Sequence, residues 1–114
     1  MSKVLDKATA HFRNRLSGEL KSVHVPEWDV KIFFKEVNTL REESKIIELA
    51  QQGKSVEALV QTLVTKARNE DGTRMFTEAD KMILMNEVDP QVIIRICGDM
   101  NSLVQPNLDE VEKN

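Results

Sequence analysis

The sequence has only one cysteine, and it has neither a long apolar run nor a segment that resembles a signal peptide. Its single cysteine, Cys97, excludes a disulfide framework within the chain. No apolar stretch approaches the roughly 18 residues that span a bilayer. Residues 1–12 lack the apolar core of a signal peptide. We therefore expect a soluble protein of the cytoplasm that has no membrane partner.

Basic residues are scattered along the chain and are outnumbered by acidic ones, 16 to 19. The formal net charge is -3, and no stretch of five basic residues occurs. Nucleic-acid binding needs a basic footprint, so we do not expect a nucleic acid as the main partner. The chain has no glycine-rich phosphate loop. His11 and His24 fall in different predicted elements, and Cys97 falls on an apolar helix face, where a thiol behaves as a small hydrophobe. We expect no enzymatic activity, no cofactor and no bound metal.

What the chain does have is hydrophobic periodicity at helical spacing. Repeats of three and four predict helices over residues 2–17, 39–53 and 55–67, a helix that Thr77 caps, and a helix that starts at Pro90. Thr39 with Glu42 forms the pattern of a capping box at the second of these helices. The expected buried side of that helix consists of Ile46, Ile47, Leu49 and Ala50.

One region has period two instead. In "VHVPEWDVKIFF", valines and aromatic residues alternate with polar ones on both sides of Pro26, which predicts a β-hairpin between about Leu20 and Val37. Phe33 is out of phase and is expected to face away from the core. The predicted class is α+β: a mostly helical single domain, residues 1–105, with a small antiparallel β-hairpin in the N-terminal third. Residues 106–114 are expected to be a polar tail that frays.

The stretch "NEDGTRMFTEAD", residues 69–80, allows two interpretations. A calcium-loop alignment places ligand oxygens at Asn69, Asp71 and Glu78. The first position of that loop is Ala67 and the ninth is Met75, and neither brings a side-chain oxygen. A loop with two carboxylates at ligand positions would bind calcium weakly.

The other interpretation is a tight corner between two helices. Asp71 and Gly72 suit a turn with glycine at positive φ. Phe76 would anchor the turn, and Thr77 with Asp80 would cap the helix that follows. We favour this structural corner over a metal site.

Two motifs in order suggest a family. "VHVPEW" followed by an alternating strand and "LREESKI", and then "NEDGTRMFTEAD", resemble the tail assembly chaperones of long-tailed, siphovirus-type bacteriophages. The resemblance covers roughly residues 12–104. Two positions depart from the pattern: Asp29 follows Trp28 where the family often has glycine, and Met75 stands where leucine is common. The first departure bears on the geometry of the hairpin turn.

The resemblance implies a non-enzymatic role in the cytoplasm of the infected host. Such chaperones coat the long, helical and apolar tape measure protein and help recruit the major tail protein. The resemblance also implies that the chain is absent from the mature virion. A subunit of 114 residues cannot cover a long rod alone, so we expect it to self-associate in an open spiral.

Adaptable apolar side chains are the expected means of binding. Met82 and Met85 belong to the run "MILM", which covers every side of a helix, so this helix is either fully buried or touches a partner. We take Met82, Met85 and Phe33 as candidate protein-binding residues. The alternatives are core filling for the methionines and a single exposed aromatic ring for Phe33.

Three other functions compete with the chaperone. They are a small regulatory calcium-binding protein, an adaptor domain, and an enzyme whose site assembles from distant residues. Ala67 counts against the first, because a carboxylate belongs at that loop position. A deep pocket that holds converging titratable groups would favour the third.

Overall fold

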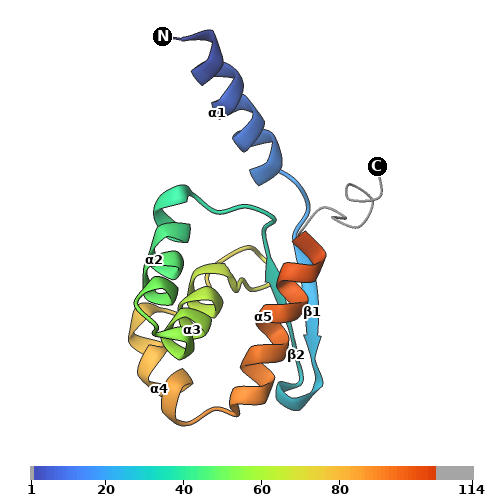
Figure 1. Ribbon diagram of the computed structural model, residues 1–114. Coiled ribbons are helices and arrows are strands. Elements are labelled where there is room, and N and C mark those ends of the chain that lie inside the picture. Colours follow the sequence, from blue (N-terminus) through green and yellow to red (C-terminus); the bar gives the residue numbers. More distant parts are fainter. Residues whose placement is uncertain (1, 105–114) are drawn as a thin grey trace, which may run out of the picture.

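The computed structural model describes residues 2–104, which form five α-helices and one antiparallel hairpin, with the hairpin at one edge of the fold beside α5 (Figure 1). The α-helices and strands are α1 (Lys3–Leu16), β1 (Lys21–Val25), β2 (Val30–Phe34), α2 (Leu40–Gln51), α3 (Ser55–Lys66), α4 (Lys81–Asn86) and α5 (Pro90–Val104). Short 3-10 turns occupy Pro26–Trp28 and Glu78–Asp80. The prediction of a mostly helical α+β fold with one hairpin in the N-terminal third is confirmed. The predicted polar tail, residues 106–114, lies outside the described residues.

The hairpin follows from the period-two pattern around Pro26. Val23 pairs with Ile32 in the antiparallel register, and both side chains are buried. Pro26 opens the 3-10 turn at the tip, and Asp29 closes it in the left-handed region at a φ of 52°. This is the position at which the resembled family often has glycine, and aspartate is one of the few other residues that adopts this conformation readily. Val30, expected on the core side, is 38% exposed, although its partner Val25 is fully buried.

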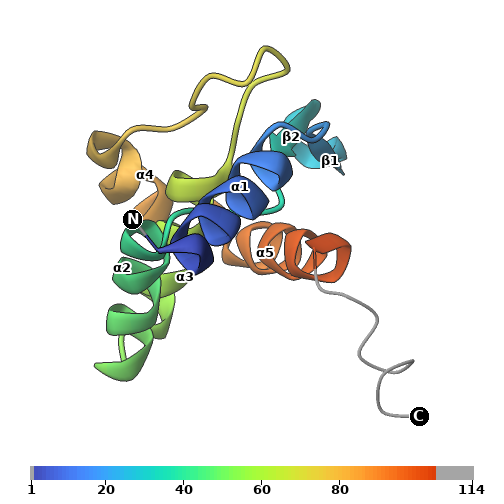
Figure 2. The same ribbon diagram turned by 90° about the horizontal axis from the view of Figure 1, so that it is seen from above.

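The core lies between the hairpin and the helices. α3 packs against α2, α4 and α5, and α5 also packs against β1. Figure 2 shows α5 along the hairpin and the long connection from α3 to α4 looping out beyond it. The fully buried side chains at the centre include Ile32, Phe34, Leu63, Val64 and Ile96. Among the described residues, no helix combines the length and the apolarity that crossing a bilayer requires.

α2 begins as expected but does not bury its apolar side. The Thr39 hydroxyl accepts a hydrogen bond from the Glu42 backbone N–H (3.1 Å), and the Glu42 carboxylate accepts one from the Thr39 N–H (3.0 Å). The predicted buried side of this helix is wrong in part: Ile46 and Leu49 are half-buried, but Ala50 is exposed, Ile47 is 48% exposed, and no residue of α2 is fully buried. The reason is position: α2 is an outer helix, and α3 is the element against which it mainly packs.

The connection between α3 and α4 is held by strand-like pairing that the sequence did not reveal. Arg68 and Phe33 exchange backbone hydrogen bonds of 2.6 and 3.0 Å, so Arg68 extends the sheet at β2. Gly72 follows in the left-handed region at a φ of 89°. The Asp71 carboxylate accepts hydrogen bonds from the backbone N–H (3.0 Å) and the hydroxyl (2.6 Å) of Thr73. Residues 68–74 thus form a closed turn beside the hairpin.

The entry into α4 is a 3-10 turn and not a full helical turn. The Asp80 carboxylate accepts hydrogen bonds from the Thr77 backbone N–H (2.8 Å) and from the Thr77 hydroxyl (3.3 Å). The Asp80 backbone N–H donates to the Thr77 carbonyl (3.0 Å). The Asp80 carboxylate therefore fixes the conformation of Thr77 at the start of the 3-10 turn. In this arrangement the Thr77 hydroxyl donates a hydrogen bond to that carboxylate.

α1 stands apart from the rest of the fold (Figure 1). The Ser2 hydroxyl accepts a hydrogen bond from the Val4 N–H (3.1 Å), which begins the helix, but no residue of α1 is buried. Its C-terminal end is tied to the segment after β2. There the Lys35 ammonium donates to the Leu16 carbonyl (2.6 Å), and Arg15 lies 3.4 Å from a Glu36 carboxylate oxygen. The N-terminal half of α1 therefore projects with its apolar side chains exposed.

An ion pair joins the hairpin tip to α5, and we expect it to make stability depend on acid pH. The Arg95 guanidinium donates two hydrogen bonds to the Glu27 carboxylate, one of them at 2.7 Å, and lowers the pKa of Glu27 to about 2. Because the pKa in the folded state is depressed, the stabilisation is complete above the ordinary pKa near 4.5 and is lost as the pH falls toward 2. The Glu27→Gln variant should melt below the parent at pH 7 and together with it near pH 2. A difference in melting temperature that does not change over this range would contradict the role given to the pair.

Candidate protein-binding surfaces

Two apolar hollows lie on either side of Leu84 and Val88, which contribute to both. The larger, which we call the Trp28 groove, has a volume of about 410 Å³. Its lining residues are Trp28, Met75, Phe76, Asp80, Ile83, Leu84 and Val88. They come from the hairpin tip, the connection after α3, α4 and the link to α5, so the groove exists only in the folded chain.

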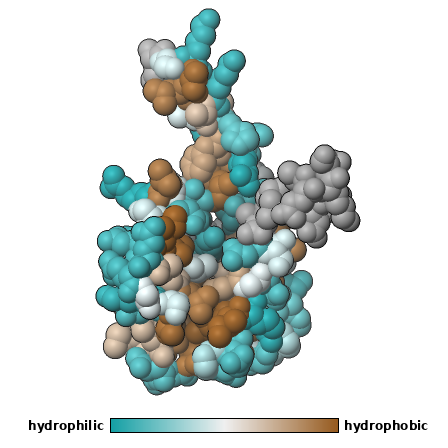
Figure 3. All heavy atoms as spheres, in the orientation of Figure 1, coloured by the Kyte–Doolittle hydropathy of each residue, from teal (hydrophilic) through white to brown (hydrophobic). Residues whose placement is uncertain are grey.

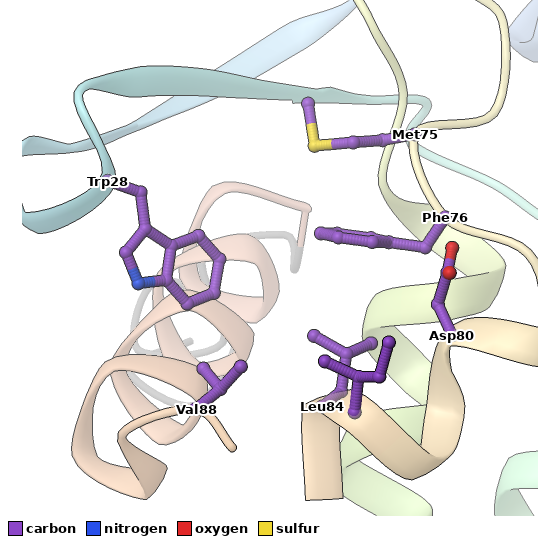
Figure 4. Close-up of a pocket in the computed structure, with 7 residues that line it drawn as sticks. Trp28, Met75, Phe76, Asp80, Leu84 and Val88 are labelled. Carbon is purple, nitrogen blue, oxygen red and sulfur yellow. The ribbon is translucent and has the colours of Figure 1, made fainter.

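Figure 4 shows how the Trp28 groove is built. The rings of Trp28 and Phe76 approach from opposite walls, and Leu84 and Val88 lie at the other end of the gap. Trp28 and Phe76 are partly buried and pack against the core. Rigid aromatic walls of this kind can hold an apolar side chain inserted between them.

The surroundings of the Trp28 groove are acidic. Asp80 is one of its lining residues. Asp29 follows Trp28 in the chain, and Glu87 and Asp89 flank Val88; all three are exposed. Two basic residues also adjoin lining residues in the chain: Lys81, which is 2.9 Å from a carboxylate oxygen of Glu78, and the exposed Arg74, whose guanidinium donates to the Val64 carbonyl (3.1 Å). The groove thus offers an apolar floor with negative charge around it.

The second hollow, which we call the Met85 groove, lies between α3, α4 and α5 and has a volume of about 110 Å³. It is lined by Val56, Leu59, Val60, Leu84, Met85, Val88, Pro90, Ile93 and Ile94. Val56 is 60% exposed and Ile94 is 48% exposed. Figure 3 shows apolar side chains gathered on the surface between the helices on the lower part of this face. The Met85 groove is therefore small and apolar, with exposed side chains among its lining residues.

The run "MILM" divides between the core and the surface. Leu84 is 5% exposed and belongs to the core, and Met85 is half-buried against it. Met82 is 67% exposed and Ile83 is 52% exposed, so half of the run faces solvent. Met82 is therefore not a core-filling residue, whereas Met85 both fills space at the core and lines the groove named after it.

Phe33 lies away from both grooves. Its backbone pairs with Arg68 on one side and with Ser22 on the other, and its side chain is half-buried. The guanidinium of Arg68 donates to the carbonyls of Thr65 (2.9 Å) and Ala67 (3.2 Å), and burial lowers the pKa of Arg68. Phe33 is thus covered in part by a neighbouring strand-like segment instead of standing alone on the surface.

The residues of the calcium-loop alignment take structural roles. Ala67 is fully buried at the first position, and the hydrogen bonds from Thr73 lower the pKa of Asp71. Glu78 pairs with Lys81, which lowers the pKa of Glu78. Within residues 2–104, no group of three or more His, Cys, Asp or Glu side chains is placed to hold a metal ion.

Two further groups with possible chemistry, the thiol of Cys97 and the carboxylate of Asp80, lie in structural settings. Cys97 is buried in α5, and burial raises the pKa of its thiol to about 11, so it is a poor nucleophile. Asp80 is the one titratable side chain that lines the Trp28 groove, and its carboxylate is held by Thr77. The hollows are suited to apolar contact and not to acid–base chemistry.

Sequence reasoning missed most of the residues that build these surfaces. Trp28 is far from Phe76, Ile83 and Val88 in the chain, and its approach to them depends on tertiary structure. The unusual signal in the sequence was the apolar run around Leu84, which continues on all sides of a six-residue helix.

Comparison with known proteins agrees with the fold. No family model and no curated protein matches the chain. The solved structure of the bacteriophage HK97 tail assembly chaperone is similar, with a TM-score of 0.62 and 17% sequence identity, over 89% of this chain and 97% of that one. The resemblance suggested by the two sequence motifs is therefore confirmed at the level of the fold, and this chain has the fold of a phage tail assembly chaperone.

Proposed function

We propose that this protein is a phage tail assembly chaperone that binds helical, apolar segments of the tape measure protein and keeps them soluble. It acts by contact alone, without catalysis. The observation that carries the proposal is the shared fold with the HK97 tail assembly chaperone over nearly all of both chains. The motifs "VHVPEW" and "NEDGTRMFTEAD" support the same role.

The surface chemistry suits such a client. An amphipathic helix that lies in an apolar groove is a common mode of recognition, and flexible methionines adapt to helices of varied sequence. Met85, Val56 and Ile94 line the Met85 groove, and Met82 is an exposed apolar side chain on the same short helix as Met85. We assign the tape measure protein to the Met85 groove and to the exposed Met82 side chain of α4. Phe33 is the weakest of the three candidates, since it is half-buried beside Arg68.

The remaining steps of the proposal follow from what a chaperone of this kind must do. Several copies line up along one tape measure protein, because one chain of 114 residues is short relative to a long rod. The complex recruits the major tail protein, whose tube displaces the chaperone. The protein then works in the cytoplasm of the infected host and is absent from the mature virion.

Coexpression with the tape measure protein of the same phage tests this proposal. We expect the parent chain to keep most of the tape measure protein soluble. Met82→Asp and Val56→Asp should each reduce the soluble amount about tenfold or more, since a carboxylate forced into an apolar contact costs well over 1.4 kcal/mol. The measurement is the tape measure protein in the soluble fraction and its co-purification with the chaperone.

Leu40→Asp is the matched control. Leu40 is 81% exposed at the start of α2 and lines neither groove, so this variant should behave as the parent does. Both test positions are exposed, and circular dichroism should show that all three variants fold. A tape measure protein that stays insoluble with the parent chain would refute the chaperone role. Equal loss with Leu40→Asp would refute the assignment to the Met85 groove.

A further inference from the structure

We propose that α1 of one copy docks into the Trp28 groove of a second copy, and that this contact links the chains head to tail. The inference deepens the proposed function, because it names the surface through which the chaperone would self-associate. It uses two features that the tape measure contact leaves unexplained. These are an amphipathic helix with no buried residue and an apolar groove with an acidic border.

The first feature is the apolar face of α1. Leu5, Ala8 and Phe12 repeat at spacings of three and four and share one side of the helix. Val4 is 74% exposed and Leu5 is 54% exposed, and Figure 3 shows apolar side chains gathered near the N-terminal end of α1. A helix of 14 residues is about 21 Å long and gains little stability alone in water, so a partner for this face is expected.

A second copy fits this role better than the same chain does. The Leu16 end of α1 is fixed beside Lys35 and Glu36, at the end of the hairpin where β1 begins and β2 finishes. Trp28 lies at the opposite end of the hairpin, at its tip. In Figure 1, α1 points away from the body, on the side opposite the tip. α1 therefore cannot reach the Trp28 groove of its own chain while these contacts hold.

The charges of α1 and of the Trp28 groove are of opposite sign, which favours this groove as the docking site for α1. The helix carries four basic residues and one acidic residue: Lys3, Lys7, Arg13, Arg15 and Asp6. The Trp28 groove has Asp80 in its lining and the exposed Asp29, Glu87 and Asp89 next to lining residues in the chain. Arg13 and Arg15 border the apolar face, and Lys3 and Lys7 lie on the other side of the helix, so the charge match is between α1 as a whole, which is positive, and the mainly acidic border of the groove. Complementary charge of this kind favours the correct pairing and speeds encounter.

The contact has a defined consequence for assembly. The two surfaces are different and lie at opposite ends of the molecule, so the contact is heterologous, and every added copy offers a new α1 and a new groove. Chains that associate in this way form rings or open filaments instead of closed two-fold dimers. The Met85 groove remains free in every copy of such a row.

Disulfide trapping between two variants, each with one introduced cysteine, tests the contact. Leu5→Cys and Ile83→Cys place thiols on the α1 face and in the Trp28 groove, at exposed positions. Cys97 should not compete, since it is buried and its pKa is about 11. Mixing the two purified chains under mild oxidation should give a mixed disulfide dimer. Pairing Ile83→Cys with Ala10→Cys, on the opposite side of α1, should give far less.

Self-association of the protein alone gives an independent measurement. Leu5→Asp should raise the dissociation constant for self-association about tenfold or more, measured by sedimentation, while Ala10→Asp should leave it near the parent value. Equal effects of the two substitutions would overturn the proposal. So would a monomeric parent protein, or a Leu5→Cys, Ile83→Cys double variant that closes within one chain.

The outcomes separate this inference from the chaperone role. If Leu5→Asp keeps the tape measure protein soluble but abolishes the filament, then the docking contact stands apart from client binding. If self-association is unchanged by Leu5→Asp while Met82→Asp still loses the tape measure protein, then the α1 contact is wrong and the chaperone role survives.

Discussion

Replacing Phe34 with alanine is expected to lower the free energy of unfolding by about 3–5 kcal/mol, the range for a large aromatic side chain removed from a core. Phe34 is fully buried at the end of β2 and belongs to the cluster that joins the hairpin to α3 and α5. The alanine would lose this apolar contact and leave a cavity that the surrounding helices cannot fully close. Urea unfolding followed by circular dichroism measures the change.

Phe33 is the matched control for this substitution. It is the preceding residue on the same strand, but its side chain is half-buried and points to the other face of the hairpin. Phe33→Ala should therefore cost less than half as much as Phe34→Ala. Equal costs at the two positions would show that the core does not lie on the side of the hairpin assigned to it.

The second large effect concerns two glycines. We expect that replacing one with alanine lowers the stability of the fold and that replacing the other raises it. At Gly72, φ is 89°, a value that non-glycine residues rarely adopt, so Gly72→Ala should destabilise the fold by about 1–2 kcal/mol. Gly98 lies within α5, where its φ is not positive, and Gly98→Ala should stabilise the fold by about 0.5–1 kcal/mol.

Comparing the two glycine variants is informative because a methyl group has room at both positions. A Cβ atom would meet no heavy atom within 4 Å at Gly72 or at Gly98, so the two changes differ in backbone conformation and not in packing. Thermal melting of both variants gives the signs directly. Two variants that shift in the same direction would contradict the left-handed turn at residues 69–73.

The elements that were predictable are those set by local sequence. Period-two alternation on both sides of Pro26 indicated the hairpin, and its register and tip agree with that pattern. The capping box of Thr39 and Glu42 marked the start of α2 within one residue. Both signals act over a few neighbouring residues, and no tertiary contact is needed to form them.

Burial of the outer helices was not predictable in the same way. An amphipathic pattern shows that a helix has an apolar side, but it does not show what covers that side. α1 has such a side with no buried residue, and α2 leaves Ile47 about half exposed at 48%. The sequence likewise could not tell Met82, which is exposed, from Met85, which lies against the core, because the run around them is apolar at every position.

The two grooves could not be predicted from local sequence patterns either. The Trp28 groove joins the hairpin tip to residues some fifty positions later, and Phe76 was expected only as an anchor for the turn. The backbone pairing of Arg68 with Phe33, which holds the connection after α3 beside the sheet, has no local sequence signal. The sequence therefore predicted most helices and the hairpin and suggested the family resemblance. The residues that form the candidate site could be identified only from the three-dimensional structure.

The most direct test of the chaperone account is the mass of the complex that this protein forms with the tape measure protein. Light scattering on the purified, soluble complex gives the number of chaperone copies on each tape measure chain. The account predicts several copies on every tape measure protein, and a number that increases with the length of that protein. A chaperone that stays monomeric, with the tape measure protein left insoluble, would contradict it.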